Sequence, residues 1–322
     1  MKTNYSFFED RYVPLQEANV NIMNQTFMYG LGVFEGIRGY WNAEHQQVYL
    51  FRLREHIERM FDSMKIMHLS CKYNVDQVCE IICELVRKNG ANTDIYVRPA
   101  VYSNTSKITP CLANVESGFC ILTLPFGDYV DTSGGLKVMV SAWRRIEDNA
   151  IPARAKIIGS YVNTALAKTD AALAGMDDCI MLSESGHVAE GSAMNLFMVK
   201  NGTLITTPTT ENILEGITRG TVLEMAQREL NLPVCARTID RSELYTADEL
   251  FFCGTGAQIA PIAQVDGRQI GATSAGPVSA LVRDTYIEIC RGNRAAYSKW
   301  LTPVYESGTS VVPLAQPVQL TA

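Results

Sequence analysis

The stretch from residue 125 to residue 135 constrains the fold of this chain most. It reads P-F-G-D-Y-V-D-T-S-G-G and stands between two apolar, strand-like segments. Glycine, proline, aspartate and serine at this density are typical of connections rather than of a core, so we predict two domains. A chain of 322 residues fits two domains of roughly 150 residues each. We expect an N-terminal domain over 1–125, a linker over 126–135, a C-terminal domain over 136–304 and a flexible tail over 305–322.

The composition is that of a globular protein, and it argues against some partners. Hydrophobic residues make up 47% of the chain and charged residues 19%, which is enough apolar material for a core. The formal net charge of −6 argues against nucleic acid and anionic membranes, which bind basic surfaces. The N-terminus shows no signal-peptide pattern, and no apolar run reaches the roughly 18 residues of a membrane span.

Cysteine and histidine usage argues against a metal site. The nine cysteines are scattered without a C-x-x-C pair, and the four histidines lack the spacing of metal ligands. We therefore expect neither a metal nor a disulfide framework. Reduced cysteines are typical of intracellular proteins, which predicts a cytoplasmic location.

Hydrophobic periodicity and turn signals predict the secondary structure. Apolar residues at spacings of three and four indicate helices, and apolar runs bounded by turn-formers indicate strands. In the N-terminal half we expect a β-rich segment over 1–50, helices over 53–67 and 75–88, strands over 96–102 and 119–124, and a loop over 103–116. In the C-terminal half we expect strands over 136–142, within 178–207, and over 250–253 and 259–265, and helices over 160–173, from about 218 to 230, and over 277–290.

Short signals indicate particular turns and orientations. The pairs Asn201-Gly202 and Asp266-Gly267 each stand between apolar runs, which is the pattern of a two-residue hairpin. Thr218 suits an N-cap position, and a helix start offers N–H groups to an anion. In the strand over 96–102, the two-residue period places Tyr96 and Arg98 on the same side.

Lys156 is the residue on which the functional interpretation depends. It stands in the stretch 152–164, which reads P-A-R-A-K-I-I-G-S-Y-V-N-T. A lysine is usually a solvated surface charge whose stem lies along apolar neighbours. The alternative is a partly desolvated lysine, because burial disfavours the ammonium form and frees a lone pair for attack on a carbonyl. The lysine alone does not decide between these two interpretations.

Four further residues have ordinary structural interpretations when each is taken singly. An arginine on a helix and a glutamate between strands are mostly solvent-exposed, and a threonine at a helix start is mostly an ordinary cap. Together with a lysine, however, these groups are the parts of a pyridoxal phosphate site. The lysine binds the cofactor's carbonyl, a carboxylate keeps the pyridine nitrogen protonated, and arginine and helix-start amides hold the phosphate. The four residues are Arg59, Glu190, Thr218 and Thr255.

Seven motifs resemble those of one protein family and occur in the same order. They read Y-G-L-G-V-F-E-G-I-R-G-Y, F-R-L-R-E-H-I-E-R-M, Y-V-R-P, A-K-x-x-x-x-Y, E-G-S-A-M-N-L-F, G-I-T-R and G-T-G-A-Q-I-A-P. They look like the motifs of the class IV aminotransferases, the fold type IV pyridoxal phosphate enzymes, and resemble the branched-chain amino acid aminotransferases most. The resemblance implies an α+β, two-domain fold like that of D-amino acid aminotransferase. A smaller N-terminal α/β domain would precede a larger C-terminal pseudo-barrel domain.

The resemblance also implies roles toward the cofactor, pyridoxal 5′-phosphate. Lys156 would be the Schiff-base lysine, and Glu190 would pair with the pyridine nitrogen. Tyr161 would lie near the phenolic oxygen of the cofactor. The residues implied for the phosphate are Arg59, the helix-start amides of Ile217 and Thr218, and the hydroxyl of Thr255.

A second set of residues is implied for the substrate. Tyr96 and the turn from Thr255 through Gly256 to Ala257 would receive the α-carboxylate. Arg98 would take the distal carboxylate when glutamate binds. The implied walls of the side-chain pocket are Phe34, Phe126, Tyr129 and Tyr161, with Tyr29 reaching it from a neighbouring subunit. Where the family commonly has P-W-G, this chain has Pro125-Phe126-Gly127.

The implied activity is a ping-pong transamination between L-branched-chain, or related hydrophobic, amino acids and 2-oxoglutarate, in a homodimer or larger homo-oligomer. Two alternatives within the same fold are an (R)-amine or D-amino acid transaminase and an aminodeoxychorismate lyase. A third alternative is a non-catalytic binding protein. The strings Y-V-R-P and V-F-E-G-I-R favour the L-branched-chain type.

Overall fold

The chain divides into two compact units. A computed structural model describes residues 4–127, 134–273 and 275–306. The first unit consists of Met1–Gly127, Ala155–Gly159 and Glu288–Ala322, and the second of Asp128–Arg154 and Ser160–Ile287.

These units differ from the domains expected from the sequence. The lysine-bearing segment 155–159 belongs with the N-terminal residues, and so does the segment from residue 288 onward. With both segments included, the first unit is not the smaller of the two, as the N-terminal domain was expected to be. Most of the expected linker and of the expected tail lies outside the described residues, so both stay predictions.

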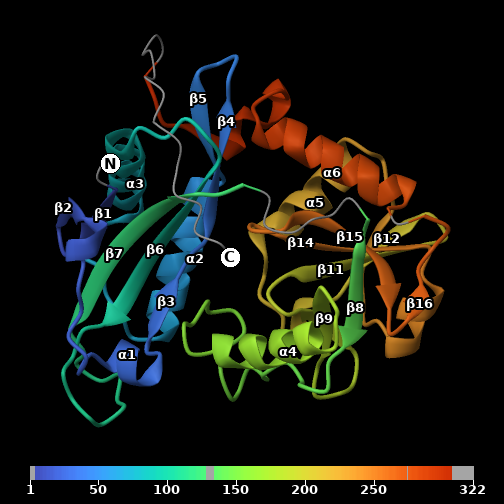
Figure 1. The fold of residues 1–322 in the computed structure, drawn as a ribbon, viewed down its shortest axis with the longest axis horizontal. Helices are drawn as coiled ribbons and strands as arrows, with labels where there is room; N and C mark the ends of the chain where they lie inside the picture. The colour runs from blue at the N-terminus through green and yellow to red at the C-terminus, as the bar shows by residue number, and fades with distance from the viewer. Residues whose placement is uncertain (1–3, 128–133, 274, 307–322) are drawn as a thin grey trace. The chain divides into compact units, whose positions relative to one another are not determined.

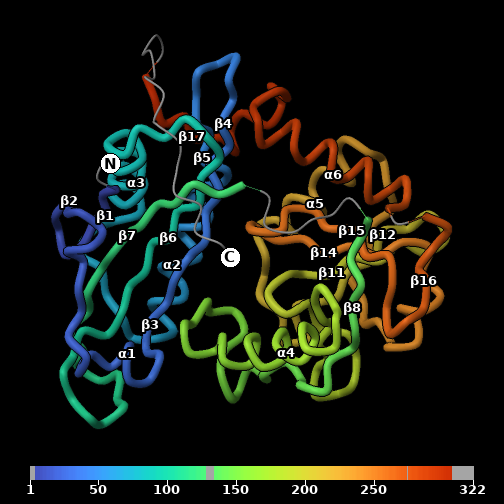
Figure 2. Tube along the Cα trace, in the orientation of Figure 1, coloured from blue at the N-terminus to red at the C-terminus, as the bar shows by residue number. Residues whose placement is uncertain are grey.

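The first unit is built on one antiparallel sheet (Figure 1). In the described residues its strands follow the spatial order β17-β5-β4-β6-β7-β1-β2, and β3 also pairs with β6. Figure 2 shows the late strand β17 beside β5, so residues near the end of the chain complete this sheet. The strands are β1 (Tyr5–Phe8), β2 (Arg11–Pro14), β3 (Gly32–Phe34), β4 (Ile37–Asn42), β5 (Gln47–Phe51), β6 (Ile95–Ser103), β7 (Ser117–Pro125) and β17 (Leu301–Pro303).

Two amphipathic helices cover this sheet, and both were predicted. They are α2 (Leu53–Ile66) and α3 (Val75–Asn89), which pack against each other and against β1, β3 and β7. Asn74 caps α3 in a capping box with Gln77, and Gly90 ends it in the left-handed region. The apolar stripe of α2 is buried because it faces the sheet, and this places Arg59 on the same helix at a fixed position.

A short helix stands where β-structure was expected. In α1 (Gln25–Tyr29) the Asn24 side chain accepts hydrogen bonds from the backbone N–H groups of Thr26 and Phe27, at 2.8 and 3.3 Å. Gly30 ends the helix with φ of +72°. An asparagine cap and a glycine stop are the ordinary signals of a helix, but the apolar residues between them favour a strand by composition.

The second unit contains a mixed sheet. Its described strands follow the order β10-β9-β8-β15-β14-β11-β12-β13, with β16 on β15. The pairs β8–β9, β8–β15 and β12–β13 are parallel, and the others are antiparallel. The strands are β8 (Leu136–Val140), β9 (Asp178–Leu182), β10 (Val188–Gly191), β11 (Asn195–Lys200), β12 (Thr203–Thr206), β13 (Val234–Ala236), β14 (Glu249–Gly254), β15 (Gln258–Val265) and β16 (Arg268–Gln269).

Both predicted hairpins are confirmed. At 201–202 and 266–267 the two turn residues all have positive φ, between 48° and 77°, which is the backbone of a two-residue hairpin that asparagine, aspartate and glycine adopt most readily. The first hairpin joins β11 to β12, and the second joins β15 to β16. Four short 3₁₀ helices occupy connections in the described residues: Leu15–Glu17, Thr209–Glu211, Arg241–Thr246 and Ala295–Trp300.

The helices of the second unit pack on its sheet. Ala167 and Ala171 of α4 (Tyr161–Leu173) are buried against Cys179 and Met181 of β9. The next helix, α5 (Ile217–Arg228), packs on β13 and β14. The last helix, α6 (Pro277–Cys290), has the bounds expected from the sequence. No helix in the described part of the chain combines the length and apolar character of a membrane span.

Candidate active site

Lys156 is held in the first unit by backbone contacts on two sides. Its N–H donates to Ser63 Oγ at 3.1 Å, and its carbonyl accepts from the N–H of Phe34 at 3.1 Å. The ammonium nitrogen lies 5.1 Å from the centre of the Phe34 ring. The side chain is half-buried, and Ala155 and Ile157 on either side are buried. Of the two interpretations left open by the sequence, this setting is that of the partly desolvated lysine.

The segment around Lys156 forms an antiparallel pairing with β3. Val33 and Ile157 form a bridge, and the N–H groups of Ile158 and Gly159 donate to the carbonyls of Gly32 and Gly30 at 2.9 and 3.1 Å. A side chain at Gly30 would come within 2.6 Å of the Gly159 α-carbon. The first glycines of the Y-G-L-G motif therefore allow the close backbone approach that positions the lysine.

A buried carboxylate joins two residues of α2. Glu35 Oε1 lies 2.7 Å from Arg59 Nε, and Oε2 lies 2.8 Å from Arg59 Nη2 and 2.7 Å from His56 Nδ1. The Glu35 side chain is 0% exposed, whereas Arg59 keeps 14% of its side chain accessible. Glu35 therefore binds one edge of the Arg59 guanidinium in a bidentate pair, which is the strongest common geometry for an arginine and a carboxylate.

The protonation states of this cluster follow from its burial. Burial alone would raise the pKa of Glu35, but the charge of Arg59 and the hydrogen bonds from His56 and Arg59 outweigh it and lower the pKa well below its usual range. Burial lowers the pKa of His56, and the charges of Arg59 and Lys156 add to this effect against the opposing Glu35. His56 is therefore neutral at about pH 7, and its Nδ1 carries the proton that faces the carboxylate.

A row of aromatic and cationic side chains continues from Lys156 within the same unit. The guanidinium carbon of Arg98 lies 4.9 Å from the Phe34 ring centre and 5.1 Å from that of Tyr96. Arg98 Nη2 donates to the Tyr96 hydroxyl at 3.1 Å, which confirms that the two residues share one face of β6. The Tyr96 and Phe126 ring centres are 5.1 Å apart. Four residues implied for the substrate pocket therefore lie together.

Of the other residues implied for the walls of that pocket, Tyr161 belongs to the second unit, and two more are not placed in this row. Tyr29 is the last residue of α1, and its hydroxyl donates to the carbonyl of Ile108 in the loop that follows β6. Its expected contact from a neighbouring subunit stays a prediction. Tyr129 lies outside the described residues, and its expected role also stays a prediction.

Glu190 is buried in the second unit beside polar partners. Its Oε1 lies 2.7 Å from Arg145 Nε, and its Oε2 accepts from Asn195 Nδ2 at 3.0 Å. The same Asn195 nitrogen donates to the carbonyl of Leu214 at 3.0 Å. An isolated buried carboxylate would be costly, so these partners allow Glu190 to stay buried and oriented.

The start of α5 lies close to this carboxylate. A side chain at Gly216 would come within 2.0 Å of Asn195 Oδ1, so the residue before the helix has to be small. Gly216 is the N-cap, and Thr218 lies inside the first turn. The expectation that Thr218 is itself the cap is therefore wrong by two positions. Ile217 and Thr218 are the first two residues of α5, so their N–H groups have no acceptor within the helix. Gly216 has no side chain that could cap them.

The remaining predicted residues also belong to the second unit. Thr255, Gly256 and Ala257 form the turn between β14 and β15, as expected of a Gly-Thr-Gly sequence. Tyr161 is the first residue of α4. The residues implied for the cofactor are thus divided between the units, with Lys156 and Arg59 in the first and the others in the second.

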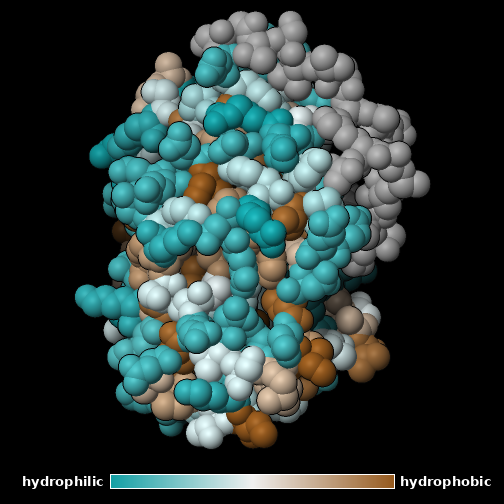
Figure 3. Space-filling model, turned by 90° about the vertical axis from the view of Figure 1, so that its left-hand side faces the viewer, coloured by the Kyte–Doolittle hydropathy of each residue, from teal (hydrophilic) through white to brown (hydrophobic). Residues whose placement is uncertain are grey.

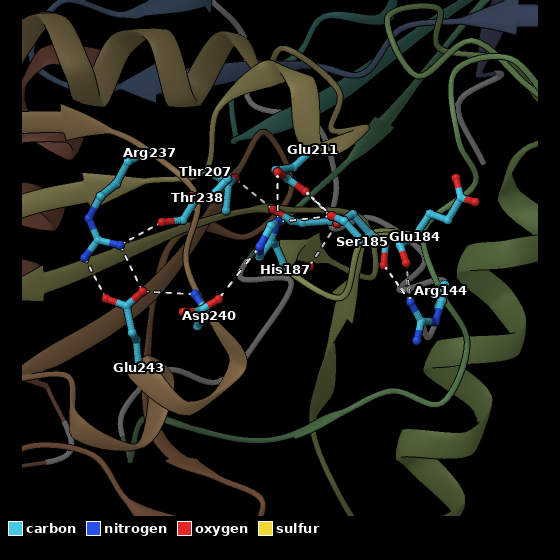
Figure 4. A network of polar contacts seen from close by, with 12 residues as sticks. Arg144, Glu184, Ser185, His187, Thr207, Glu211, Arg237, Thr238, Asp240 and Glu243 are labelled. Atoms are coloured by element: carbon cyan, nitrogen blue, oxygen red, sulfur yellow. Dashed lines mark hydrogen bonds and ion pairs between the residues drawn. The ribbon is translucent and has the colours of Figure 1, made fainter.

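A separate polar network holds the hairpin that leads into β10 (Figure 4). His187 Nδ1 lies 3.0 Å from Ser185 Oγ and 3.3 Å from Glu211 Oε1, and its Nε2 lies 3.8 Å from Asp240 Oδ1. Ser183 also donates to Glu211, at 2.5 Å. These contacts fix the turn three residues before Glu190, and their histidine takes no part in the groups assigned to the cofactor.

Comparisons with known proteins agree with the motifs. The family model described as amino-transferase class IV matches residues 32–265. The chain belongs to the class IV aminotransferases. A relative from Aquifex aeolicus, named a probable branched-chain-amino-acid aminotransferase, is 44% identical over 303 residues, which cover 94% of this chain and 97% of that protein.

Two solved structures resemble this class IV aminotransferase closely. One is a branched-chain aminotransferase from Thermoproteus uzoniensis with norvaline, which has a TM-score of 0.90 and 40% identity and covers 94% of this chain and 100% of that chain. The other is a branched-chain amino acid aminotransferase from Thermobaculum terrenum in its PLP form, with a TM-score of 0.90, 36% identity, and coverage of 94% and 99%. The predicted fold type IV architecture is confirmed.

Sequence reasoning missed several residues of the site. Glu35 and His56 stand within quoted motifs, but neither was assigned a role, and Arg145 and Asn195 were not singled out. A signal was present for two of them, because His56 and Arg59 are three residues apart and share one face of α2. No local pattern announces Arg145, which reaches Glu190 from 45 positions away in the sequence.

Proposed function

We propose that this class IV aminotransferase moves the amino group between L-branched-chain, or related hydrophobic, amino acids and 2-oxoglutarate in a ping-pong reaction. Its cofactor is pyridoxal 5′-phosphate, which supplies an electron sink for the bonds at the substrate α-carbon. The residues fit such a group, because the chain offers a half-buried lysine, a held arginine and a buried carboxylate.

The first unit supplies the reacting amine and an anchor for the phosphate. Lys156 Nζ would hold the cofactor through its carbonyl, and as a free amine it would move the proton of the substrate α-carbon. Its backbone is fixed on two sides, so the amine works from a constant position. Arg59 binds the phosphate, and a guanidinium is well suited to this because its N–H groups match phosphate oxygens.

The second unit supplies the groups that tune the ring and complete the phosphate site. Glu190 holds the proton on the pyridine nitrogen, and Arg145 and Asn195 hold Glu190. The amides of Ile217 and Thr218 and the hydroxyl of Thr255 would bind the phosphate, and Tyr161 would lie near the phenolic oxygen. The first turn of α5 favours an anion because its N–H groups point outward at the positive end of the helix dipole.

One observation carries the substrate assignment. Lys156 Nζ and the Arg98 guanidinium carbon lie 5.1 and 4.9 Å from the centre of the Phe34 ring. The pocket therefore offers an apolar ring to a branched side chain and a cation to the distal carboxylate of glutamate. A ping-pong transaminase has to accept both side chains in turn, and this pair of groups allows it. The α-carboxylate is received by Tyr96 and by the turn of Thr255, Gly256 and Ala257.

An amino-donor panel tests the proposal. The purified protein with pyridoxal phosphate is given 2-oxoglutarate and either L-leucine, D-alanine or (R)-1-phenylethylamine, and glutamate formation is measured. We expect L-leucine to react fastest and the Lys156→Ala variant to form no glutamate. Reaction with the last two donors only would replace the assignment by a D-amino acid or (R)-amine transaminase of the same fold.

A different outcome would support a non-catalytic protein. Bound pyridoxal phosphate colours an enzyme of this kind yellow, and the colour depends on Lys156. A protein that stays colourless after addition of the cofactor, and forms no glutamate from any donor, would contradict the proposed function as a whole.

We also infer a homodimer in the cytoplasm. Exposed apolar residues cluster in and around α1 and on the loop after β6, with Ile22 at 72%, Phe27 at 67% and Ile108 at 75% of their full exposure. Figure 3 shows brown, hydrophobic residues at several places on one face of the molecule, some of them at its lower edge. Exposed apolar residues gathered in this way are typical of an interface, and the mass of the protein measured by light scattering tests the inferred dimer. The nine cysteines, which are scattered without a C-x-x-C pair, favour a reducing location of this kind.

A further inference from the structure

Glu35 is a charged group that the proposed reaction does not use. Its carboxylate has no accessible surface, yet it is ionised and accepts hydrogen bonds from three groups: the Arg59 guanidinium, His56 Nδ1 and the Gly36 N–H at 3.3 Å. Burying a charge is expensive unless it is paired. Because the Glu35 carboxylate is costly to bury and accepts several hydrogen bonds, it strongly restricts the orientation of the side chains that bind it.

The geometry shows which partner is restricted. Both oxygens of Glu35 bind the Nε and Nη2 edge of Arg59, so that edge faces inward. The guanidinium has further N–H donors on its other edges, and Arg59 is the member of the pair that reaches the surface of the unit. His56 fixes the carboxylate in turn, because its protonated Nδ1 contacts the oxygen that also binds Nη2.

The same helix links this pair to the reacting lysine. Ser63 Oγ donates to the carbonyl of Arg59 at 3.0 Å and accepts from the N–H of Lys156 at 3.1 Å. Lys156 has this second support and the pairing with β3, so its position does not depend on Glu35 alone. A change at Glu35 therefore acts mainly on the arginine and hardly on the lysine.

We propose that Glu35, locked by His56, is a positioning residue that holds the Arg59 guanidinium in the orientation that receives the cofactor's phosphate. The inference rests on the proposed function, since it takes pyridoxal phosphate as the ligand. Glu35 also has an opposing effect, because its negative charge offsets that of Arg59 and weakens the attraction for an anion. The bidentate geometry decides between the two effects: an arginine fixed in advance loses little freedom when phosphate binds.

A comparison of two ligands tests this proposal. Apoprotein is titrated with pyridoxal phosphate and, separately, with pyridoxal, which has the same carbonyl but no phosphate, and the visible absorbance reports binding. For Glu35→Gln we expect the dissociation constant of pyridoxal phosphate to rise by about tenfold or more, by analogy with the hydrogen-bond partners of metal-ligating residues. The dissociation constant of pyridoxal should stay the same.

Three matched variants complete the design. Glu55→Gln removes a half-exposed carboxylate that pairs with Arg52 at the start of α2, and it should change neither titration. Arg59→Gln should weaken pyridoxal phosphate binding at least as much as Glu35→Gln does. In the Arg59→Gln background, Glu35→Gln should cause no further loss, because Glu35 acts through Arg59.

Each contrary result has a defined meaning. Equal weakening of both ligands by Glu35→Gln would reduce Glu35 to a structural role, and tighter binding of pyridoxal phosphate would mean that its charge effect dominates; either result overturns the proposal. Should Glu35→Gln fail to fold, as judged by near-ultraviolet circular dichroism, the double variant decides, because it leaves no buried charge. Weaker binding by the double variant than by Arg59→Gln then overturns the proposal. A wild-type protein that binds neither ligand would instead contradict the proposed function.

Discussion

At the scale of single residues, the first unit depends on a charge cluster that has to be satisfied internally. Glu35 and His56 are both buried; Arg59 and His56 keep the pKa of Glu35 low, whereas burial is the main cause of the lowered pKa of His56. The histidine is kept neutral although an ionised carboxylate lies 2.7 Å from it, because burial outweighs that attraction. Its protonation therefore couples the stability of the fold to pH.

We predict a loss of stability on mild acidification. The folded pKa of His56 is lowered below its unfolded value of about 6.5, so His56 contributes stability above that value and the contribution is lost as pH falls. Between about pH 7.5 and 5.5, His56 binds a proton in the unfolded chain but not in the folded chain. This difference lowers the free energy of unfolding by about 1 kcal/mol. Urea denaturation at the two pH values measures this difference.

A pair of variants isolates the contribution of His56. In His56→Asn the amide nitrogen can replace the Nδ1 donor without titrating, and we expect the pH dependence over this range to shrink by the same amount. His68→Gln changes an exposed histidine just beyond α2 and should leave the dependence as it is. An unchanged slope in His56→Asn would show that His56 titrates normally in the folded protein.

Residue identities were predictable only where a motif carried them. Lys156, Arg59 and Glu190 belong to strings whose resemblance to the family's motifs implies their roles, and these roles stay predictions. Glu35 looks like any glutamate beside a glycine, because what makes it special is a helix that folds against it 21 and 24 positions later. Such long-range partners leave no periodic signal in the sequence.

At the scale of elements, the position of the lysine is set by a backbone pairing rather than by a helix or a long strand. The segment 155–159 joins β3 and Gly30 through three backbone hydrogen bonds and through contacts in which glycine is needed, as at Gly30. Because the pairing is short, one intruding side chain can displace it.

We predict that Gly30→Ala disturbs this pairing more than backbone strain alone would. Gly30 and Gly175 both end helices with φ near +73°, and alanine in that region costs about 1–2 kcal/mol. At Gly175 no atom lies within 4 Å of the added carbon, whereas at Gly30 it meets Gly159. Chemical denaturation should show Gly30→Ala to be the more destabilised by about 1–3 kcal/mol, with weaker binding of pyridoxal phosphate as well.

The outcome for Gly175→Ala serves as the reference for strain. If both variants lose the same free energy and bind the cofactor equally, the approach of Gly30 to Gly159 has no role in placing Lys156.

Most elements themselves were predictable, since α2, α3, α6 and both hairpins follow from periodicity and turn chemistry. The exceptions are α1, where capping by Asn24 outweighed composition, and the start of α5, which follows Gly216 and not the expected cap Thr218.

At the scale of the whole molecule, the chain distributes its chemistry over two units that are not continuous in sequence. The lysine segment belongs to the first unit, although the residues directly before and after it in the chain belong to the second unit. A linear reading finds a boundary where composition changes, near 125–135, but it cannot see that five residues return to the first unit. They do so because the backbone of β3 has an open edge for them.

The central claim is that Lys156 carries the cofactor, and covalent capture tests it most directly. Protein incubated with pyridoxal phosphate is reduced with borohydride, which fixes the bound group on its lysine, and the modified peptide is identified by mass spectrometry. We predict the phosphopyridoxyl group on Lys156, none in Lys156→Ala, and unchanged labelling in Lys72→Ala, which removes an exposed lysine. Labelling of a different lysine in the wild-type protein, or of no lysine at all, would contradict the account.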